Sequence, residues 1–260
     1  MSTSHGGSAS EQSALAQGDV VAIGDLAQRA TASRSIARMS EARALTAREL
    51  EARRLIHRDE NSPEATNAFR EIRTRLLALG GTQNFVTMVT PVSPKSGGSF
   101  VARNLAAAFA FDEAKTALLI DCNLRRPAQH KALGIDADHG GLIDYLEESE
   151  SEIANILYRT GIPRLRLIPS GRPREMSAEY FSSMRMRTLI DSLRHRYADR
   201  YLFLDGPAMK GAPDARILSD LADFVVVVAA YGRDTAASIG QAIATIDPQK
   251  LAGVVFDHTP

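Results

Sequence analysis

A loop of small residues, set between an apolar run and a helix-forming segment, is the first place in this sequence where chemistry is expected. Residues 85–90 (FVTMVT) are mostly apolar, residues 91–99 (PVSPKSGGS) form the loop, and residues 100–115 favour a helix. Small residues let backbone N–H groups wrap an anion, and the start of the following helix adds its dipole. The loop therefore predicts a phosphate site, formed by Lys95, Ser96, Gly97, Gly98, Ser99 and Phe100.

Two aspartates follow apolar runs and fall at the ends of predicted strands. Asp121 ends residues 116–121 (TALLID), and Asp205 ends residues 201–205 (YLFLD). Open α/β sheets bind ligands at these carboxyl ends, so both aspartates should lie beside the loop. A carboxylate there can hold magnesium through water or accept a proton from an attacking hydroxyl. Ser99 could also give its hydroxyl to magnesium, so Ser99, Asp121 and Asp205 are the candidate metal-binding and catalytic residues.

The rest of the sequence supplies the elements that must position these residues. Strands without polar alternation, separated by helices, indicate a parallel sheet that is covered on both faces. The predicted fold class is therefore α/β, a doubly wound and mostly parallel sheet with helices on both faces. Six strands are expected, at residues 85–90, 116–121, 165–168, 201–205, 224–229 and 251–256. Further helices are expected at residues 62–80, 140–148, 152–158, 178–197, 213–221 and 234–246.

Residues 62–64 (SPE) have the features of a helix start. They offer a capping side chain, a proline at the first helical position and an acid in the first turn. Phe69, Ile72 and Leu76 then recur at helical spacing, which predicts one buried face.

The N-terminal part of the chain differs in composition from the rest. Residues 1–18 are mostly Ser, Gly, Ala and Gln and are expected to be disordered. Residues 40–58 contain good helix formers and predict a helical arm, which is either a partly solvated helix or a docking arm for a partner. Its sparse apolar anchors are Leu45, Leu50, Leu55 and Ile56. The predicted domains are a tail and arm over residues 1–61 and an α/β domain over residues 62–260.

The bulk composition restricts the class of protein. Hydrophobic residues make up 44% of the chain and charged residues 24%, which is ordinary for a globular protein. The formal net charge is +0, so no overall field draws the chain to nucleic acid or to an anionic membrane. The single cysteine, Cys122, excludes an internal disulfide and should be buried. Without a signal segment or a membrane-spanning apolar run, the chain is expected to be cytoplasmic, with membrane contact only through a partner.

Several segments match the motifs of one protein family. Residues 89–110 (VTPVSPKSGGSFVARNLAAAFA) match the pattern VTSxxPGEGKSTxAxNLAxxFA without a gap. Residues 118–127 (LLIDCNLRRP) match LLIDxDLRRP, and residues 202–207 (LFLDGP) match the Walker B segment IIIDTPP. Residues 140–142 (GGL) and 167–171 (LIPSG) match a GL turn and the segment LIPAG. Over roughly residues 60–260 the chain thus resembles the bacterial tyrosine kinases of capsule and exopolysaccharide synthesis, relatives of the partition and division-site P-loop ATPases.

The chain departs from this family at positions that matter for catalysis. Gly98 stands where the family has the catalytic lysine of its loop, and Lys95 stands where the family has the first glycine. Asn123 replaces the second aspartate of the family's Asp-x-Asp motif. The tyrosine-rich C-terminal tail is absent, since the last tyrosine is Tyr231. A hydrogen bond to a charged group contributes ~1.5–3 kcal/mol, so losing the lysine should weaken phosphate binding by roughly 10- to 100-fold.

The family's oligomerisation helix has the pattern Glu-x-x-Arg-x-x-Arg. Arg70 and Arg73 keep the two arginines, whereas Asn67 replaces the glutamate. The resemblance therefore implies a homo-oligomer, with weaker self-association than in the family.

The resemblance implies a cytoplasmic, kinase-like P-loop protein of exopolysaccharide synthesis and export, with ATP and Mg²⁺ as cofactors. The expected partner is an inner-membrane chain-length determinant (a polysaccharide co-polymerase), which would hold the protein at the periphery of the inner membrane. The missing lysine favours a member that regulates by binding, with weak or no kinase activity. Three alternatives stay open: an active tyrosine autokinase that uses Lys95, a positioning ATPase of the partition type, and a structural subunit with an empty site. Ser93 replaces the signature lysine of the partition group, which argues against the second alternative.

Overall fold

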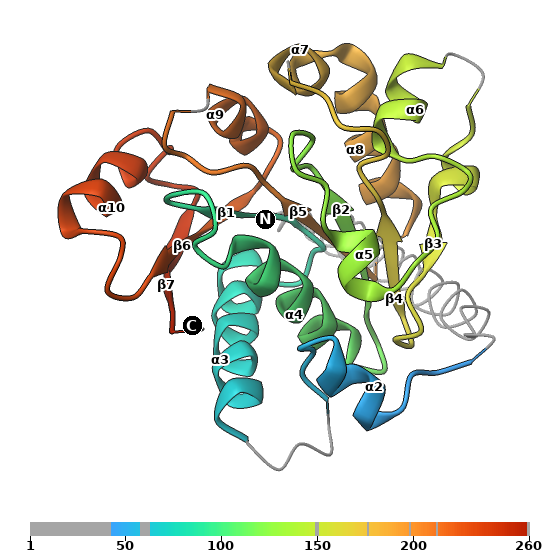
Figure 1. Cartoon of the computed structure of the whole chain (residues 1–260), viewed down its shortest axis with the longest axis horizontal. Coiled ribbons are helices and arrows are strands. Elements are labelled where there is room, and N and C mark those ends of the chain that lie inside the picture. Colours follow the sequence, from blue (N-terminus) through green and yellow to red (C-terminus); the bar gives the residue numbers. More distant parts are fainter. Residues whose placement is uncertain are drawn as a thin grey trace, which may run out of the picture.

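The computed structural model of the chain describes residues 43–57, 63–148, 151–175, 177–197, 199–211 and 213–258. Within these residues the centre of the molecule is a seven-stranded sheet in the order β3-β4-β2-β5-β1-β6-β7 (Figure 1). All neighbouring strands are parallel except β3 and β4. The strands are β1 (Val86–Pro91), β2 (Thr116–Asp121), β3 (Tyr158–Arg159), β4 (Leu165–Ile168), β5 (Arg200–Asp205), β6 (Phe224–Ala230) and β7 (Leu251–Asp257).

The buried character of the central strands explains why the sequence predicts them well. Every residue of β1, β2 and β5 is buried, because helices cover both faces of a parallel sheet. The six expected strands are confirmed to within one residue at either end. The predicted α/β fold class, with a mostly parallel and doubly wound sheet, is confirmed as well.

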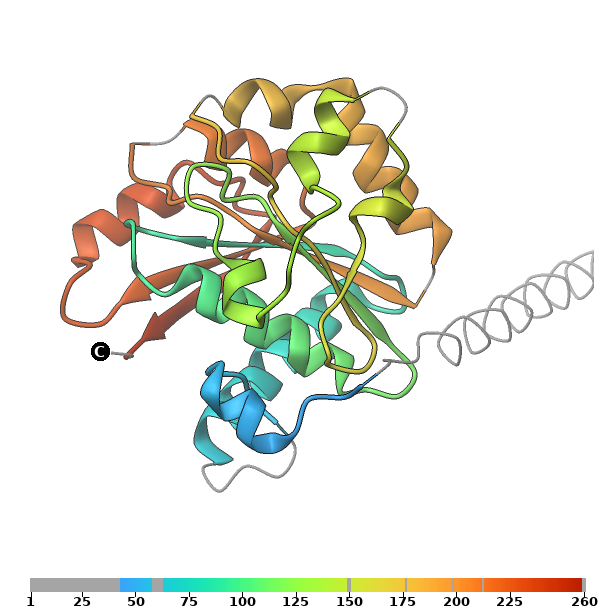
Figure 2. The ribbon, with the colours of Figure 1, turned by 45° about the vertical axis from the view of Figure 1, so that its right-hand side comes forward.

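Two hydrophobic clusters fill the space between the sheet and its helices, one on each face. Figure 2 shows the two helical layers on opposite sides of the sheet. One layer holds α2 (Ala47–Ala52), α3 (Pro63–Gly80), α4 (Gly98–Ala110) and α5 (Gln129–Leu133). The other holds α6 (Leu142–Glu147), the 3-10 turn η1 (Ile153–Ile156), α7 (Ser177–Ser182), α8 (Met184–Arg196), α9 (Pro213–Asp220) and α10 (Ala236–Ile243). None of the helices that the structure describes combines the length and apolar character needed to cross a bilayer.

The helix predictions hold for α3, α6, α9 and α10 and need correction elsewhere. Residues 152–158 form η1 and then the short strand β3 instead of an α-helix. The expected helix at residues 178–197 is divided into α7 and α8, because Ser183 is extended and its side chain accepts the Met186 N–H to cap α8.

The N-terminal arm differs from the expected helix at residues 40–58. Of residues 43–57, only α2 is helical, and the chain then leaves the helix through Arg54, whose φ is 56°. Leu55 and Ile56 are nearly fully buried in the cluster beneath α3 and α4. The arm is therefore packed on the α/β domain along residues 43–57, although the boundary at residue 61 stays a prediction. Residues 1–18 and the capping residue Ser62 lie outside the described residues.

Candidate functional site

The loop after β1 has the backbone geometry of an anion cradle. Gly97 adopts a left-handed conformation (φ 83°) and immediately precedes α4. It gives no side-chain cap, and the carboxylate of Asp257 lies where a side chain at this position would stand. The first N–H groups of an α-helix have no partner within the helix, so a helix N-terminus at this place suits an anion. Gly97 and Gly98 let the chain turn tightly into the helix. The predicted phosphate loop therefore has a suitable backbone.

Gly98 has no room for a side chain, because the ring of Pro91 packs against it. A Cβ atom built at Gly98 would lie 2.6 Å from Cδ of Pro91 and 2.9 Å from its Cγ. Such distances are far inside van der Waals contact. Pro91 stands where the family motif has serine, so the loop lacks both the lysine and the space that a lysine needs.

Lys95 lies in the same loop but on its exposed side. Its backbone has a positive φ of 68°, which is costly for a residue with a Cβ atom. The side chain is exposed, and within the described residues it makes no hydrogen bond or ion pair. Nothing in its surroundings directs it toward the first turn of α4.

A set of polar contacts holds the loop against the segment that follows β6. Ser96 donates its hydroxyl to Asp234 (2.7 Å), and Arg233 donates to the Ser96 hydroxyl (2.8 Å) and to the Pro94 carbonyl (3.1 Å). Burial opposes ionisation of Asp234, but hydrogen bonds from Ser96 and the Ala230 N–H outweigh it and lower its pKa. Ser96 thus fastens the loop instead of facing a ligand with its side chain.

Ser99 and Asp205 meet at the first turn of α4. The Ser99 hydroxyl donates to one carboxylate oxygen of Asp205 at 3.1 Å. The other oxygen accepts a hydrogen bond of 2.6 Å from the side-chain amide of Gln129. The same Gln129 nitrogen donates to the Ser99 carbonyl at 2.9 Å. Hydroxyl and carboxylate oxygens are ligands that Mg²⁺ accepts, so Ser99 and Asp205 fit the ion that the fold family implies.

Asp121 is the neighbour of Asp205 across the β2–β5 pair. Its carboxylate accepts the N–H groups of Asn123 (3.2 Å), Ala128 (3.0 Å) and Gln129 (3.0 Å). Burial raises the pKa of Asp121 to about 6 in spite of these hydrogen bonds. Burial, and next the charge of Asp121, raise the pKa of Asp205 to about 7. The structure thus brings the two predicted aspartates together with Ser99.

Gln129 and Arg103 are residues of this site that the sequence analysis missed. Gln129 is fully buried at the start of α5, a short helix without a sequence pattern, so no signal indicated it. Arg103 is the one charged residue of α4 (GSFVARNLAAAFA). A single charge in an otherwise uncharged, mostly apolar helix could have indicated it from the sequence. Its guanidinium donates to the Ser99 carbonyl at 3.2 Å, and its charge lowers the pKa of Asp205 against the larger effect of burial.

The other expected site residues lie farther from this cluster or serve packing. Phe100 makes an edge contact with Phe69 of α3, with ring centroids 6.0 Å apart, so only its backbone N–H is free to face a phosphate. Arg73 donates to the Ala108 carbonyl (3.2 Å) and lies 3.7 Å from Asp112 of its own chain. Arg70 is exposed on α3. Cys122 is buried and free, as expected.

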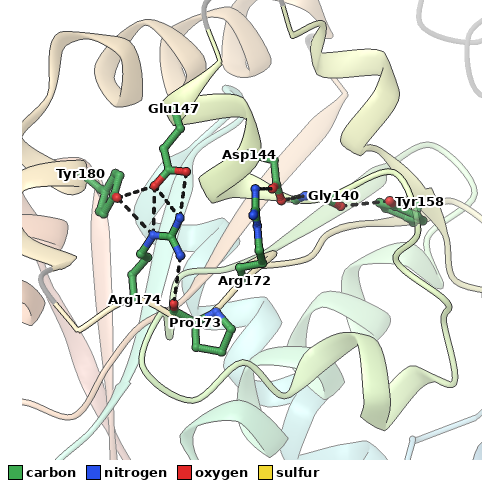
Figure 3. A network of polar contacts seen from close by, with 9 residues as sticks. Gly140, Asp144, Glu147, Tyr158, Arg172, Pro173, Arg174 and Tyr180 are labelled. Carbon is green, nitrogen blue, oxygen red and sulfur yellow. Dashed lines mark hydrogen bonds and ion pairs between the residues drawn. The ribbon is translucent and has the colours of Figure 1, made fainter.

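The GL turn and the LIPSG segment are in contact at the carboxyl edge of the sheet. The Leu142 N–H donates to the Pro169 carbonyl (2.8 Å), and the Ile143 N–H donates to the Ser170 carbonyl (3.0 Å). Beyond this contact, two arginines of the following loop pair with acids of α6 (Figure 3). The pairs are Arg172 with Asp144 (3.2 Å) and Arg174 with Glu147 (2.8 Å). These charges are partly exposed, so we attribute to them a modest role in fixing α6.

Asn104 joins the N-terminal arm to the phosphate loop helix. Its side chain accepts the Ile56 N–H (2.8 Å) and donates to the carbonyls of Arg54 (3.0 Å) and Phe100 (3.0 Å). The residue is fully buried. Asn104 thus links the arm to the Phe100 carbonyl, next to Ser99 in the chain, and the arm brings the charge of Arg54 close to that of Arg103.

Asn104→Ala should detach the arm from α4. The substitution leaves the buried Ile56 N–H unpaired, so we expect the free energy of unfolding to fall by about 2–3 kcal/mol in urea titrations. Amide hydrogen exchange in residues 47–57 should accelerate with it. The exposed Asn67→Ala is the control, and unchanged exchange in Asn104→Ala would refute the link.

The fold and this site define a class of protein. A parallel sheet carries a glycine-containing loop between β1 and α4, and an aspartate at the end of the adjacent strand β5 meets the serine of the loop. This is the arrangement of a P-loop nucleoside triphosphatase.

Comparison with known proteins narrows this class. No protein-family model matches the chain. The tyrosine-protein kinase Wzc of Salmonella typhimurium (strain LT2) is 33% identical over 196 residues, which cover 74% of this chain and 27% of Wzc. The kinase domain of Escherichia coli tyrosine kinase Etk has a TM-score of 0.67 at 25% identity, covering 83% of this chain and 87% of that structure. The chimerical protein CapA2B2 has a TM-score of 0.70 at 24% identity, covering 84% of this chain and 92% of that structure.

The chain belongs to the bacterial tyrosine kinase family of P-loop ATPases, as a member with an altered phosphate loop. It spans about a quarter of the length of the curated relatives that it matches.

Proposed function

We propose that this chain is a kinase-like, nucleotide-binding protein of exopolysaccharide or capsule export with weak or no kinase activity. The observation that carries the proposal is the packing of Pro91 against Gly98, which excludes a lysine from the phosphate loop. The lysine of such loops neutralises charge on the transferred phosphoryl group, so its loss affects the transition state at least as much as binding. Asn123, in place of the second aspartate of the family motif, weakens the catalytic machinery further.

The retained parts of the site support binding of a nucleotide. The α4 N-terminus would hold phosphate oxygens, and Ser99 with Asp205 would hold Mg²⁺, which neutralises phosphate charge when bound. Asp205 is held in position by Gln129 at 2.6 Å, so the site stays ordered without the lysine.

The proposed role is regulatory and cytoplasmic. By its relationship to the tyrosine kinase Wzc, we expect the chain to bind an inner-membrane chain-length determinant (a polysaccharide co-polymerase) and to be peripheral to that membrane. Arg70, exposed on α3, and Arg73 would serve in a homo-oligomer. Arg73 already contacts Ala108 and Asp112 of its own chain, so self-association should be weak.

The test is incubation of the purified protein with labelled ATP, followed by detection of phosphotyrosine. We expect bound nucleotide and little or no phosphotyrosine. A variant that regains the lysine, Pro91→Ser with Gly98→Lys, is the matched comparison. Phosphotyrosine in the natural chain at the level of this variant would overturn the proposal in favour of an active autokinase. Failure to co-purify with the co-expressed chain-length determinant would overturn the partner assignment.

Lys95→Ala should leave nucleotide affinity within roughly 2-fold of the natural chain. The side chain is exposed and, within the described residues, without a partner, so no contact orients it toward a phosphate. Calorimetric titration with ATP measures this. Loss of binding in Lys95→Ala would instead show that Lys95 replaces the missing loop lysine.

A further inference from the structure

Arg103 places a guanidinium at the first turn of α4. It follows Ser99 by four residues, so both side chains lie on one face of the helix. Helical side chains lean toward the N-terminus, and the guanidinium of Arg103 accordingly donates to the Ser99 carbonyl at 3.2 Å. Its charge acts on Asp205, which in turn accepts the Ser99 hydroxyl. A positive charge is therefore present beside the loop from which the lysine is missing.

The guanidinium is partly buried and lacks a matched counter-charge. Within the described residues, Arg103 has no carboxylate within 4.0 Å, and its Nε is buried without a hydrogen-bond partner. The guanidinium carbon lies 5.4 Å from the centre of the Phe100 ring. The nearby charge of Arg54 adds repulsion. A desolvated cation without a paired acid is costly, and a bound anion would remove that cost.

A second unpaired group lies against the same carbonyl. The side-chain amide of Gln129 donates to the Ser99 carbonyl and to Asp205, which fixes its orientation because both partners are acceptors. Its own oxygen is fully buried and has no partner among the described residues. An unpaired donor on Arg103 and an unpaired acceptor on Gln129 thus flank Ser99. This pairing suits a ligand that carries both an anionic oxygen and a donor such as a bound water or hydroxyl.

We infer that Arg103 is a phosphate-binding residue, which supplies from within α4 the positive charge that the loop lysine supplies in relatives. The inference rests on the proposed binding of a nucleotide at this loop, and it assigns the recognition of its phosphates to a named cation. Arginine suits the position because its planar guanidinium can contact two oxygens of one phosphate. Gln129 positions Ser99 and Asp205 around the same phosphate.

Calorimetric titration of the full chain with ATP tests the inference. Arg103→Gln should weaken ATP binding by roughly 10-fold or more, since a hydrogen bond to a charged group is lost. Arg103→Lys should retain much of the affinity. Arg187→Gln, which removes an exposed arginine of α8, is the matched control and should bind like the natural chain. Tripolyphosphate should show the same order of affinities, because the contact is made to phosphate and not to the base.

Adding Arg103→Gln to the variant that regains the loop lysine distinguishes loss of a phosphate contact from loss of folding. In the variant with Pro91→Ser and Gly98→Lys, the added lysine should take over the charge, so Arg103→Gln should cost less than 3-fold in affinity there. Equal affinity of Arg103→Gln and the natural chain would overturn the role of Arg103 while leaving nucleotide binding intact. If the natural chain binds neither ATP nor tripolyphosphate, the inference fails together with nucleotide binding, and the partner role is judged separately by co-purification.

Discussion

Asp205→Asn should make the nucleotide-free protein more stable at pH 8, with a smaller gain at pH 5. In the folded chain, burial and the charge of Asp121 raise the pKa of Asp205 from an ordinary 3.8 to about 7. The folded state therefore keeps a proton that the unfolded state releases between about pH 4 and pH 7. By linkage, the stability that this proton contributes is complete below pH 4 and is lost as the pH rises to 7. Asparagine is neutral throughout and avoids this loss.

The expected gain in the free energy of unfolding is large for a single substitution. A pKa shift corresponds to ~1.4 kcal/mol per unit, which puts the ceiling on the order of 4 kcal/mol at pH 8. The amide nitrogen of asparagine cannot accept the hydrogen bond that Gln129 donates to Asp205. Gln129 can instead turn its unpaired oxygen toward this nitrogen and accept a hydrogen bond from it. A net gain of about 2 kcal/mol should raise the melting temperature by roughly 5 °C.

Thermal unfolding in EDTA at pH 8 and at pH 5 measures the effect. The exposed Asp220→Asn makes the same charge change and should show no comparable gain. A melting temperature for Asp205→Asn that is lower than that of the natural chain, by the same amount at both pH values, would contradict the prediction. It would mean that the hydrogen bonds of the carboxylate outweigh the cost of its buried charge.

Restoring the loop lysine should succeed only when Pro91 is replaced as well. In Gly98→Lys alone, the new Cβ atom would lie 2.6 Å from the proline ring, and such overpacking costs about 1–3 kcal/mol. We expect that variant to be less stable, with little gain in ATP affinity. Pro91→Ser with Gly98→Lys should relieve the contact and raise ATP affinity by roughly 10- to 100-fold.

Alanine at the same position separates the steric effect from the charge. Gly98→Ala should destabilise the chain, and adding Pro91→Ser should recover the stability without a gain in affinity. Urea unfolding and calorimetric titration measure the two effects independently. A full gain in affinity in Gly98→Lys alone would show that the proline ring moves easily and does not exclude the lysine.

The order of elements and the place of the site follow from the sequence alone. The strands β1, β2 and β5 are buried runs without polar alternation. This pattern is local, so it indicates strands without knowledge of how the elements pack. In a parallel sheet their carboxyl ends share one edge, so Ser99, Asp121 and Asp205 had to lie near one another. The absence of the loop lysine is likewise visible in the sequence, where Gly98 occupies its position.

Only the tertiary structure shows which contacts surround the position of the missing lysine. The contact of Pro91 with Gly98 joins the end of a strand to the start of a helix, and no spacing rule predicts such a steric pair. Gln129 reaches Asp205 across 76 residues of sequence, and Asn104 reaches Ile56 across 48, so neither partner has a local pattern. Arg103 stood out in an apolar helix, but only packing shows that its guanidinium lies beside Ser99 without a paired acid. Sequence periodicity reports which face of an element is buried, whereas the chemistry of this site depends on contacts between elements.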